Sequence, residues 1–515
     1  MNKPNILLIF TDQQRFDALG AAGNKVIRTP NMDSLAKEGR MYSSCMSPSP
    51  LCQPARACVV NGLTAGRLGC LENNVPRSYD PGKALPRLLH DAGYYCKAVG
   101  KMHFSNKPYE VDYGMDDMVL SEETRGVRFT KQKEDVVFDD YDKFLIRNHR
   151  WGWDKPTEIG YNEIKPLLNP LPPEYHVTRW CGDEAVKFLK TQKKADKPFF
   201  LWTSFVKPHV PYDCPRHLAT LYDPSSMPRP WVSGKDGTAD NPYIQSYRVA
   251  NEFDLYSEHA RNLALAYYYA NITFIDEEIG KLLATLREIG KDGNTIVIFT
   301  SDHGDMMGDH GLFYKCFGFE GSMHVPLIIR YPGRVAAGSR EERVVSLLDL
   351  YPTLLNLAGV PWDAGTIPGE DLLSASGRDF AFSEVLYPPY YLAHVRTKEW
   401  KYLFYQNGGR EALYHLSEDP HELDDLSLDC RYASVLQELR QKGEEYVARN
   451  GSVHGVLDEG GHFIHEELHG HGPSASPFSR MPWDYRIPPV DVKEGDLRKT
   501  FWNGGSEDWS DHLRK

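Results

Sequence analysis

The sequence lacks any apolar run long enough to cross a membrane, which needs about 20 consecutive apolar residues. Its first apolar run covers only residues 6–10 and ends at Thr11-Asp12. The apolar region of a secretory signal takes about 7–15 residues, so this run is also too short for one. We therefore expect no membrane association and a cytoplasmic location, provided that Met1 is the natural first residue.

The chain is also short of cysteine pairs and of positive charge. Its nine cysteines form no C-x-x-C pair, which argues against a disulfide framework or a structural zinc site. Lysine and arginine number 59 against 71 aspartate and glutamate, a formal net charge of −12. Nucleic-acid-binding proteins usually carry basic surfaces, so we expect no nucleic-acid partner. A small anionic substrate stays compatible, because a cationic pocket can form locally in an acidic protein.

What the sequence does contain is an alternation of apolar strands and amphipathic helices. The segments NILLIFT (5–11) and TIVIFT (295–300) predict buried strands that lead into Asp12 and Asp302. Residues 262–288 show the period of a helix. This alternation predicts an α/β fold with a mostly parallel sheet and helices on both faces. Ligands of such sheets bind at the carboxyl ends of the strands, so the two aspartates should meet at one edge.

Composition divides the chain into three regions. Residues 1–377 are assigned to a large α/β domain, in which the irregular, aromatic-rich segment 104–180 is expected to form loops over a cleft. Residues 378–450, with short strand-like pieces and a helix at about 431–449, predict a smaller C-terminal α+β subdomain. Residues 451–515 form an extension rich in Gly, His, Pro and Trp.

The extension contains more aromatic residues than disordered tails usually do. Among them are Phe463, Phe478, Trp483, Tyr485, Trp502 and Trp509. Such residues tend to find a protein surface, and Trp and Tyr are enriched in the cores of interfaces. We expect the extension either to pair copies of the chain into a homo-oligomer or to wrap its own subunit.

The sharpest motif is Cys52-Gln53-Pro54-Ala55-Arg56, followed by Thr64-Ala65-Gly66-Arg67. Alone, the pentapeptide fits a turn with a buried cysteine equally well. Together the two segments resemble the signature of the type I sulfatases, members of the alkaline-phosphatase-like superfamily. The resemblance implies that Cys52 is oxidised to formylglycine by a formylglycine-generating or an anaerobic sulfatase-maturating enzyme. It also implies that one hydroxyl of the hydrated aldehyde attacks sulfur while the other later expels sulfate.

The resemblance further implies a divalent metal site. Asp12 and Gln13 match the first ligand pair of the family, and Asp302 and His303 match the second, beside Cys52. Many members have two carboxylates at the first pair, so Gln13 is either a weaker ligand or only a support. Carboxylate and amide oxygens suit Ca²⁺, with Mg²⁺ and Mn²⁺ open as alternatives. Imidazole suits softer metals, so His303 has the alternative role of partner to the nucleophile.

A set of cationic residues completes the resemblance. Arg56 is implied to orient the formylglycine, and it lies in the first turn of a helix if that helix starts near Pro54. Lys101 and His103 match the K-x-H pair of the family, and they would point the same way on an extended backbone.

His209, Lys315 and Asn73 match the remaining positions, Asn73 with less specificity. The resemblance makes His209, Lys315, Lys101 and Asn73 groups that bind the substrate. A sulfate transition state needs several cations and donors around its oxygens. His103 or His209 has the further role of proton donor to the leaving alcohol.

A second motif, His465-Glu466-Glu467-Leu468-His469, spells the H-E-x-x-H of zinc proteases. That site needs both histidines on one face of a stable helix, and a third ligand. Glycines surround this motif, and Ala475 stands where a third histidine would fall. We therefore expect a His-rich loop here.

Taken together, the resemblance implies an alkaline-phosphatase-like α/β sandwich with a smaller C-terminal α+β domain. It implies hydrolysis of sulfate monoesters, whether carbohydrate, aryl or choline sulfates. Two alternatives stay open: a phosphonate monoester or phosphodiester hydrolase of the same superfamily, and a non-catalytic binder of sulfated glycans. Lys101 and His103 favour a terminal sulfate with unshielded oxygens, and intact Cys52 and Arg56 argue against a decayed site.

Overall fold

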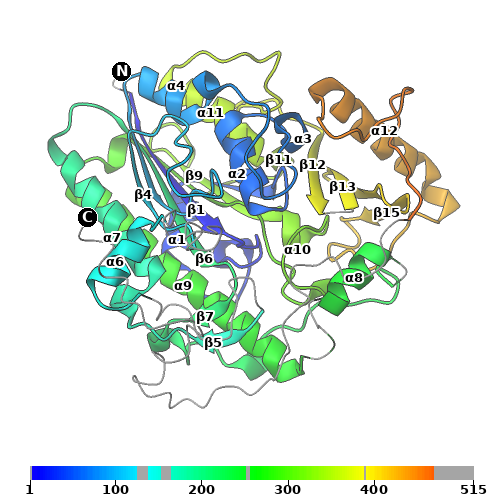
Figure 1. The fold of residues 1–515 in the computed structure, drawn as a ribbon, viewed down its shortest axis with the longest axis horizontal. Helices are drawn as coiled ribbons and strands as arrows, with labels where there is room; N and C mark the ends of the chain where they lie inside the picture. The colour runs from blue at the N-terminus through cyan, green and yellow to red at the C-terminus, as the bar shows by residue number, and fades with distance from the viewer. Residues whose placement is uncertain are drawn as a thin grey trace.

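The computed structural model describes residues 3–123, 137–151, 164–239, 241–250, 254, 256–387 and 390–468. A nine-stranded sheet forms the larger part, and a four-stranded antiparallel sheet lies beside it (Figure 1). None of the helices within these ranges is long and apolar enough to span a membrane.

The large sheet has the order β10-β2-β9-β8-β1-β6-β3-β4, with β11 paired to β2. At its centre, β1 (Asn5–Asp12) runs parallel to β8 (Thr295–Ser301) and β6 (Phe199–Pro208). All three are buried throughout, as expected for strands covered on both faces. The others are β2 (Arg40–Met46), β3 (Tyr95–Gly100), β4 (Asp117–Leu120), β9 (His324–Arg330), β10 (Ser339–Glu341) and β11 (Val345–Ser346). Only the pairings of β9 with β2 and β8 are antiparallel, so among the described strands the sheet is mostly parallel, as predicted.

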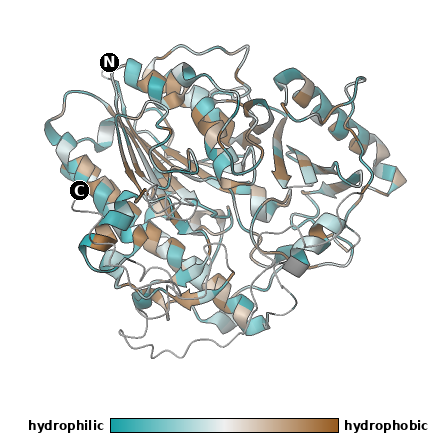
Figure 2. Ribbon diagram, in the orientation of Figure 1, coloured by the Kyte–Doolittle hydropathy of each residue, from teal (hydrophilic) through white to brown (hydrophobic). Residues whose placement is uncertain are grey.

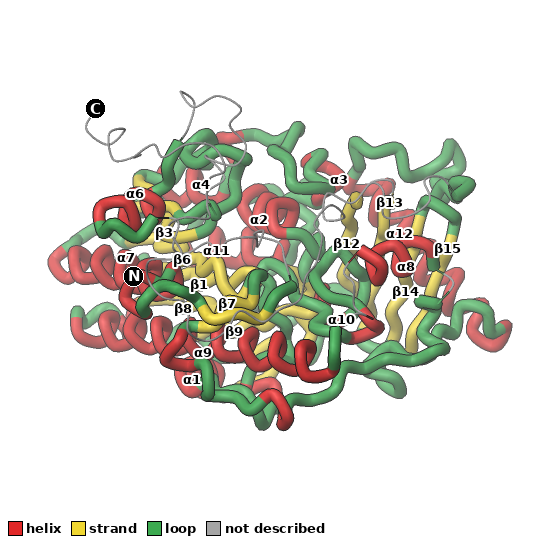
Figure 3. Tube along the Cα trace, turned by 60° about the horizontal axis from the view of Figure 1, so that its bottom comes forward, coloured by secondary structure: helices red, strands yellow, loops and turns green. Residues whose placement is uncertain are grey.

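Helices cover both faces of this sheet. One face packs against α1 (Pro30–Glu38), α7 (Val177–Thr191) and α9 (Glu258–Glu288), the other against α2 (Cys52–Asn61), α4 (Leu85–Asp91) and α11 (Leu350–Ala358). Figure 3 shows α1 and α9 on one side of the strands and α2 and α4 on the other. The central strands are largely hydrophobic, whereas the helices contain both hydrophilic and hydrophobic residues (Figure 2). The fold is the α/β sandwich expected from the sequence.

The segment 104–180 is less irregular than expected. It contains β4, α6 (Asp140–Arg147), β5 (Pro166–Leu168) and the start of α7. Trp180, at the end of this segment, lies in α7 and is buried in the core layer, so this part of the segment is not a loop over a cleft. Trp153 lies outside the described residues. The remaining short elements are α3 (Ala65–Leu68), α8 (Pro242–Ala250), α10 (Glu320–Met323) and β7 (Tyr212–Cys214).

The second sheet is a meander of β12 (Phe380–Tyr387), β13 (Tyr390–Thr397), β14 (Trp400–Tyr405) and β15 (Arg410–His415). Helix α12 (Ala433–Asn450) packs on β13 and β14, at the right of Figure 1. The chain then returns to this sheet, because Val456 and Phe463 are buried and Phe463 stacks on Phe404 with ring centres 4.6 Å apart. The first part of the extension therefore wraps its own subunit. Residues 469–515 lie outside the described residues.

Residues 465–468 do not form the helix that a zinc protease motif requires. Glu466 instead makes an isolated β-bridge with Asn407, and His465 donates a 3.2 Å hydrogen bond from Nδ1 to the Gly409 carbonyl. His469 lies outside the described residues. The His-rich loop expected from the sequence agrees with this stretch.

Candidate active site

Parallel strands deliver the key side chains to one edge of the large sheet. β1 and β8 pair in register up to Thr11 and Ser301, so Asp12 and Asp302 emerge side by side. β6 runs parallel to β1, and β3 runs parallel to β6. Their carboxyl ends lead into His209 and Lys101, respectively. This edge is where ligands bind in parallel sheets.

Helix α2 presents Cys52 to the same edge. The helix begins at Cys52, two residues before the start expected at Pro54. No side chain of the preceding residue caps it, and Oδ1 of Asn73 accepts a 3.1 Å hydrogen bond from the N–H of Gln53 instead. Asn73, an expected substrate-binding residue, is exposed beside the nucleophile and satisfies an orphan donor of the helix.

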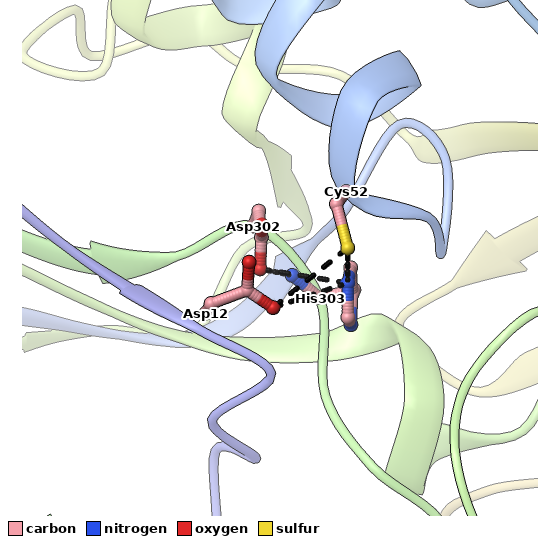
Figure 4. A group of neighbouring side chains, drawn as sticks. All are labelled: Asp12, Cys52, Asp302 and His303. Carbon is pink, nitrogen blue, oxygen red and sulfur yellow. Dashed lines mark hydrogen bonds and ion pairs between the residues drawn. The ribbon is translucent and has the colours of Figure 1, made fainter. Parts of the chain in front are cut away.

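The surroundings of Cys52 are strongly cationic. Its Sγ lies 3.2 Å from Nε2 of His303 and 3.8 Å from Oδ1 of Asp12 (Figure 4). Burial raises the pKa of the thiol, but Lys315, Lys101 and His303 lower it by more, so the pKa stays well below its usual range. The pocket thus favours negative charge at this atom.

His303 is held in one orientation. Its Nδ1 lies 2.9 Å from the Gly304 carbonyl, which accepts a hydrogen bond from the ring. The opposite nitrogen, Nε2, therefore faces Cys52. Burial lowers the pKa of His303, while Asp302 and Cys52 raise it by more, and the net shift is upward.

Two buried carboxylates form the base of the site. Ligand atoms of Asp12, Cys52, Asp302 and His303 all lie within 4.8 Å of one another, and all four residues are buried (Figure 4). Burial and Cys52 raise the pKa of Asp12, but Lys101, His209 and Arg56 bring it down to about 2. Burial and the charge of Asp12 raise the pKa of Asp302. Two adjacent carboxylates that repel each other, with an imidazole beside them, fit a divalent cation.

Arg56 binds both carboxylates. Its side chain is fully buried, and it donates from Nε to Asp302 Oδ2 at 2.8 Å and from Nη2 to Asp12 Oδ2 at 3.4 Å. Nη1 donates to the hydroxyl of Ser204 and to the Lys101 carbonyl. The guanidinium therefore ties α2 to residues at the ends of β1, β3 and β8 and to Ser204 within β6.

Gln13 links two other groups of the site. Its backbone is left-handed, with φ of 75°. The side-chain Oε1 accepts a 2.7 Å hydrogen bond from Nζ of Lys315, and Nε2 donates to Asp305. The amide is thus oriented with its oxygen toward Lys315, and that oxygen keeps a second lone pair.

His103 enters the site differently from the expectation. Its φ of 52° is left-handed, so the backbone from Lys101 to His103 does not meet the condition, an extended chain, under which the two side chains would point the same way. The N–H of His103 donates to Oε1 of Glu122 at 2.8 Å, and a side-chain hydrogen bond from His103 helps to lower the pKa of Cys52. Both His103 and Lys101 still reach the site.

The sequence reasoning missed three acidic residues that support the site: Glu122, Glu123 and Asp305. Glu123 accepts from Lys101 at 2.9 Å, and Asp305 accepts from Gln13 and, at 2.7 Å, from Tyr212. A usable signal was present for the first two. The short apolar run of β4 ends in Ser-Glu-Glu, just as β1 ends in an aspartate.

Comparison with known proteins places this site in a family. The family model described as Sulfatase matches residues 4–360, and the model described as N-sulphoglucosamine sulphohydrolase, C-terminal, matches residues 308–449. The arylsulfatase of Clostridium perfringens is 32% identical over 462 residues, covering 85% of this chain and 93% of its own. The choline-sulfatase of Rhizobium meliloti is 31% identical, covering 83% of both chains.

Solved structures share the fold. The phosphonate monoester hydrolase of Agrobacterium radiobacter superposes with a TM-score of 0.74 at 26% identity, covering 87% of this chain and 96% of its own. A structure in complex with its substrate D-glucosamine-2-N,6-O-disulfate superposes with a TM-score of 0.68 at 23% identity, covering 87% and 98%. The Sulfatase model covers more than half of the 515 residues. The chain therefore belongs to the sulfatase family of the alkaline-phosphatase-like superfamily and is a sulfuric ester hydrolase.

Proposed function

We propose that the chain hydrolyses sulfate monoesters of saccharides or aryl alcohols, with residue 52 as formylglycine beside a divalent metal. The observation that carries the proposal is the position of Cys52. Its sulfur lies at the start of α2, 3.2 Å from His303, within the buried cluster that includes Asp12 and Asp302. Relatives named arylsulfatase and N-acetylglucosamine-6-O-sulfatase support the substrate class.

The sulfur of Cys52 stands in for a hydroxyl of the hydrated aldehyde. Formylglycine would supply one hydroxyl to attack sulfur and a second whose deprotonation expels sulfate. Its formation requires a maturation enzyme that oxidises the thiol to an aldehyde. The N-terminal end of α2 favours negative charge at this position, and the Nε2 atom of His303 is placed to hold or accept a proton of the attacking hydroxyl.

Asp12 and Asp302 would hold the metal, with the oxygen of Gln13 at hand as a neutral ligand and with His303 left as the partner of the nucleophile. We propose Ca²⁺, because oxygen donors dominate this set. When bound, the ion would neutralise the paired carboxylates and polarise an oxygen of the substrate.

Lys101, Lys315 and His209 are proposed to bind the sulfate and its leaving oxygen. Lys315 Nζ lies 2.6 Å from Nε2 of His209, so this pair can move a proton to the leaving alcohol. Fixed cationic donors in a buried site stabilise developing charge more than the same donors in water.

A second candidate is phosphonate monoester hydrolysis. The observation in its favour is the likeness to the hydrolase of Agrobacterium radiobacter, at 26% identity and a TM-score of 0.74. Lys101 and His103 weigh against it, because several cationic groups suit a terminal sulfate with unshielded oxygens.

Three substrates with the same leaving group separate the candidates: 4-nitrophenyl sulfate, 4-nitrophenyl phenylphosphonate and bis(4-nitrophenyl) phosphate. The expected order of kcat/KM puts the sulfate first, and Cys52→Ala abolishes turnover of all three. A higher kcat/KM for the phosphonate would replace the proposal with the second candidate. A panel of sulfated sugars and choline sulfate then identifies the natural alcohol.

A further inference from the structure

The carboxylate of Glu123 contacts two residues of the site, Lys101 and His209. Its Oε2 accepts from Nζ of Lys101 at 2.9 Å, and its Oε1 lies 3.5 Å from Nδ1 of His209. The carboxylate is buried, with 5% of its side chain exposed. One carboxylate therefore contacts a cation from the end of β3 and an imidazole from the end of β6.

These contacts belong to a closed circuit of side chains. Lys101 also donates to Asp12 at 2.7 Å. On the other side, His209 contacts Lys315 at 2.6 Å, and Lys315 donates to Gln13 at 2.7 Å. Asp12 and Gln13 are neighbours in the chain. Glu123 closes the circuit, because it contacts both Lys101 and His209.

The contacts of the circuit determine which ring nitrogen of His209 carries the proton. An ammonium group donates but cannot accept, so Nε2 of His209 accepts from Lys315. The ring proton is then on Nδ1, which faces the Val210 carbonyl at 2.8 Å as well as Glu123. The Val210 carbonyl can only accept, so it holds the Nδ1–H tautomer, and the Glu123 carboxylate on the same side supports the ring orientation that Lys315 needs.

The backbone around Glu123 is strained in support of this placement. Its φ of 53° is left-handed, a conformation that a non-glycine residue adopts only at a cost in free energy. The preceding Glu122 holds the turn, since its Oε1 accepts from the N–H groups of Met102 and His103, both at 2.8 Å. The turn after β4 thus fixes the Lys101–His103 segment in two ways. Glu122 binds the backbone of this segment, and Glu123 binds the side chain of Lys101.

We propose that Glu123 is a positioning residue that holds Lys101 and His209, and through His209 also Lys315, for transfer of a proton to the leaving alcohol. The proposal rests on the proposed function for the identity of the reaction. It predicts a loss that depends on the leaving group, because an alkoxide needs a proton more than a nitrophenolate does.

The test compares Glu123→Gln and Glu123→Asp with the wild type on 4-nitrophenyl sulfate and on a sugar 6-sulfate. For Glu123→Gln, kcat on the sugar sulfate should fall about 10–100-fold with KM changed less than about threefold. The fall on the nitrophenyl ester should be at least about fivefold smaller. Glu123→Asp keeps the charge and should recover part of the loss. Glu110→Gln, at an exposed site, is the matched control and should behave as wild type.

A readout without turnover separates this proposal from the proposed function. Nitrogen-15 NMR of histidine-labelled protein, with the His209 signal assigned by His209→Gln, should show the Nδ1-protonated tautomer in the wild type and a changed Nδ1 chemical shift in Glu123→Gln. Wild-type protein that cleaves no sulfate ester would contradict the proposed function alone. An unchanged His209 signal, or equal losses of kcat on both substrates in a Glu123→Gln variant with wild-type melting temperature, would overturn the role of Glu123.

Discussion

Arg56 donates a 2.8 Å hydrogen bond from Nε to Asp302, and neither side chain is accessible to solvent. The same guanidinium reaches Asp12 at 3.4 Å. Removing one partner of such a buried pair leaves a charge without compensation, which costs about 3–5 kcal/mol. Arg56 therefore stabilises the folded protein, and this effect can be measured separately from any part it has in catalysis.

We predict that Arg56→Met lowers the free energy of unfolding of metal-free protein by about 3–5 kcal/mol. Urea unfolding followed by tryptophan fluorescence measures this change. Arg67→Met is the control, because Arg67 donates a single hydrogen bond near the surface, to the Thr366 carbonyl, and its loss should cost less than about 1 kcal/mol. An equal loss in the free energy of unfolding for the two substitutions would refute the stabilising role of Arg56.

Metal binding should depend on each of the paired carboxylates. Asp12→Asn and Asp302→Asn each remove an anionic ligand from the buried cluster, so both variants should lose the ion on dialysis that the wild type retains. Elemental analysis by mass spectrometry gives the ion content and its identity. Asp91→Asn, at an exposed position, should retain the ion. Full occupancy in Asp12→Asn would contradict the assignment of this ligand.

Glu384 should make stability fall as pH rises. It is buried beside the motif that follows α2, where it accepts from the N–H of Gly66 at 2.6 Å and from the hydroxyl of Tyr391 at 2.9 Å. Burial outweighs both hydrogen bonds and raises its pKa from 4.5 to about 7. The folded state thus binds this proton more tightly than the unfolded state. The stability it contributes is complete below about pH 4.5 and is lost as pH rises to about 7.

Glu384→Gln should remove that loss, since a neutral amide cannot titrate. At pH 8 the variant should be more stable than the wild type by up to about 3 kcal/mol, and the difference should vanish near pH 4.5. Urea unfolding across this pH range measures it, with the exposed Glu438→Gln as control. A variant that is less stable than the wild type at pH 8 would show that the folded protein does not raise the pKa of this carboxyl group.

The C-terminal extension divides into two parts with separate predictions. Phe463 is buried against the second sheet, so Phe463→Ala should destabilise the protein by about 3–5 kcal/mol. The part beyond residue 468 is predicted to join copies of the chain. Light scattering after size-exclusion chromatography should therefore show a smaller species for a chain ending at Leu468, with its melting temperature unchanged. An unchanged mass in solution would refute self-association through this part.

The meeting of Asp12 and Asp302 could be predicted because two apolar runs end in aspartates and parallel strands align their ends. The arrangement of α2 could not. The start of a helix is usually marked in the sequence by a capping side chain just before its first residue. Here the capping oxygen belongs to Asn73, which lies 20 residues after Gln53, the residue whose N–H it accepts.

The contacts of Glu123 and the turn of His103 could not be predicted, for a different reason. Their contacts depend on β4 lying beside β3 and on β3 lying beside β6, an order that no local pattern encodes. The left-handed backbone of His103 likewise accompanies a hydrogen bond from its N–H to Glu122, 19 residues away in the chain.

The central claim is that residue 52 acts as formylglycine, and peptide mass spectrometry of active protein tests it most directly. Trypsin releases residues 41–56 as one peptide, which contains both Cys45 and Cys52. Cys45 is buried outside the cluster and serves as the internal control. Protein co-expressed with a maturation enzyme should carry an aldehyde or its hydrate at residue 52 and a thiol at residue 45, with the aldehyde fraction proportional to specific activity. A fully active sample in which residue 52 is entirely thiol would contradict the account.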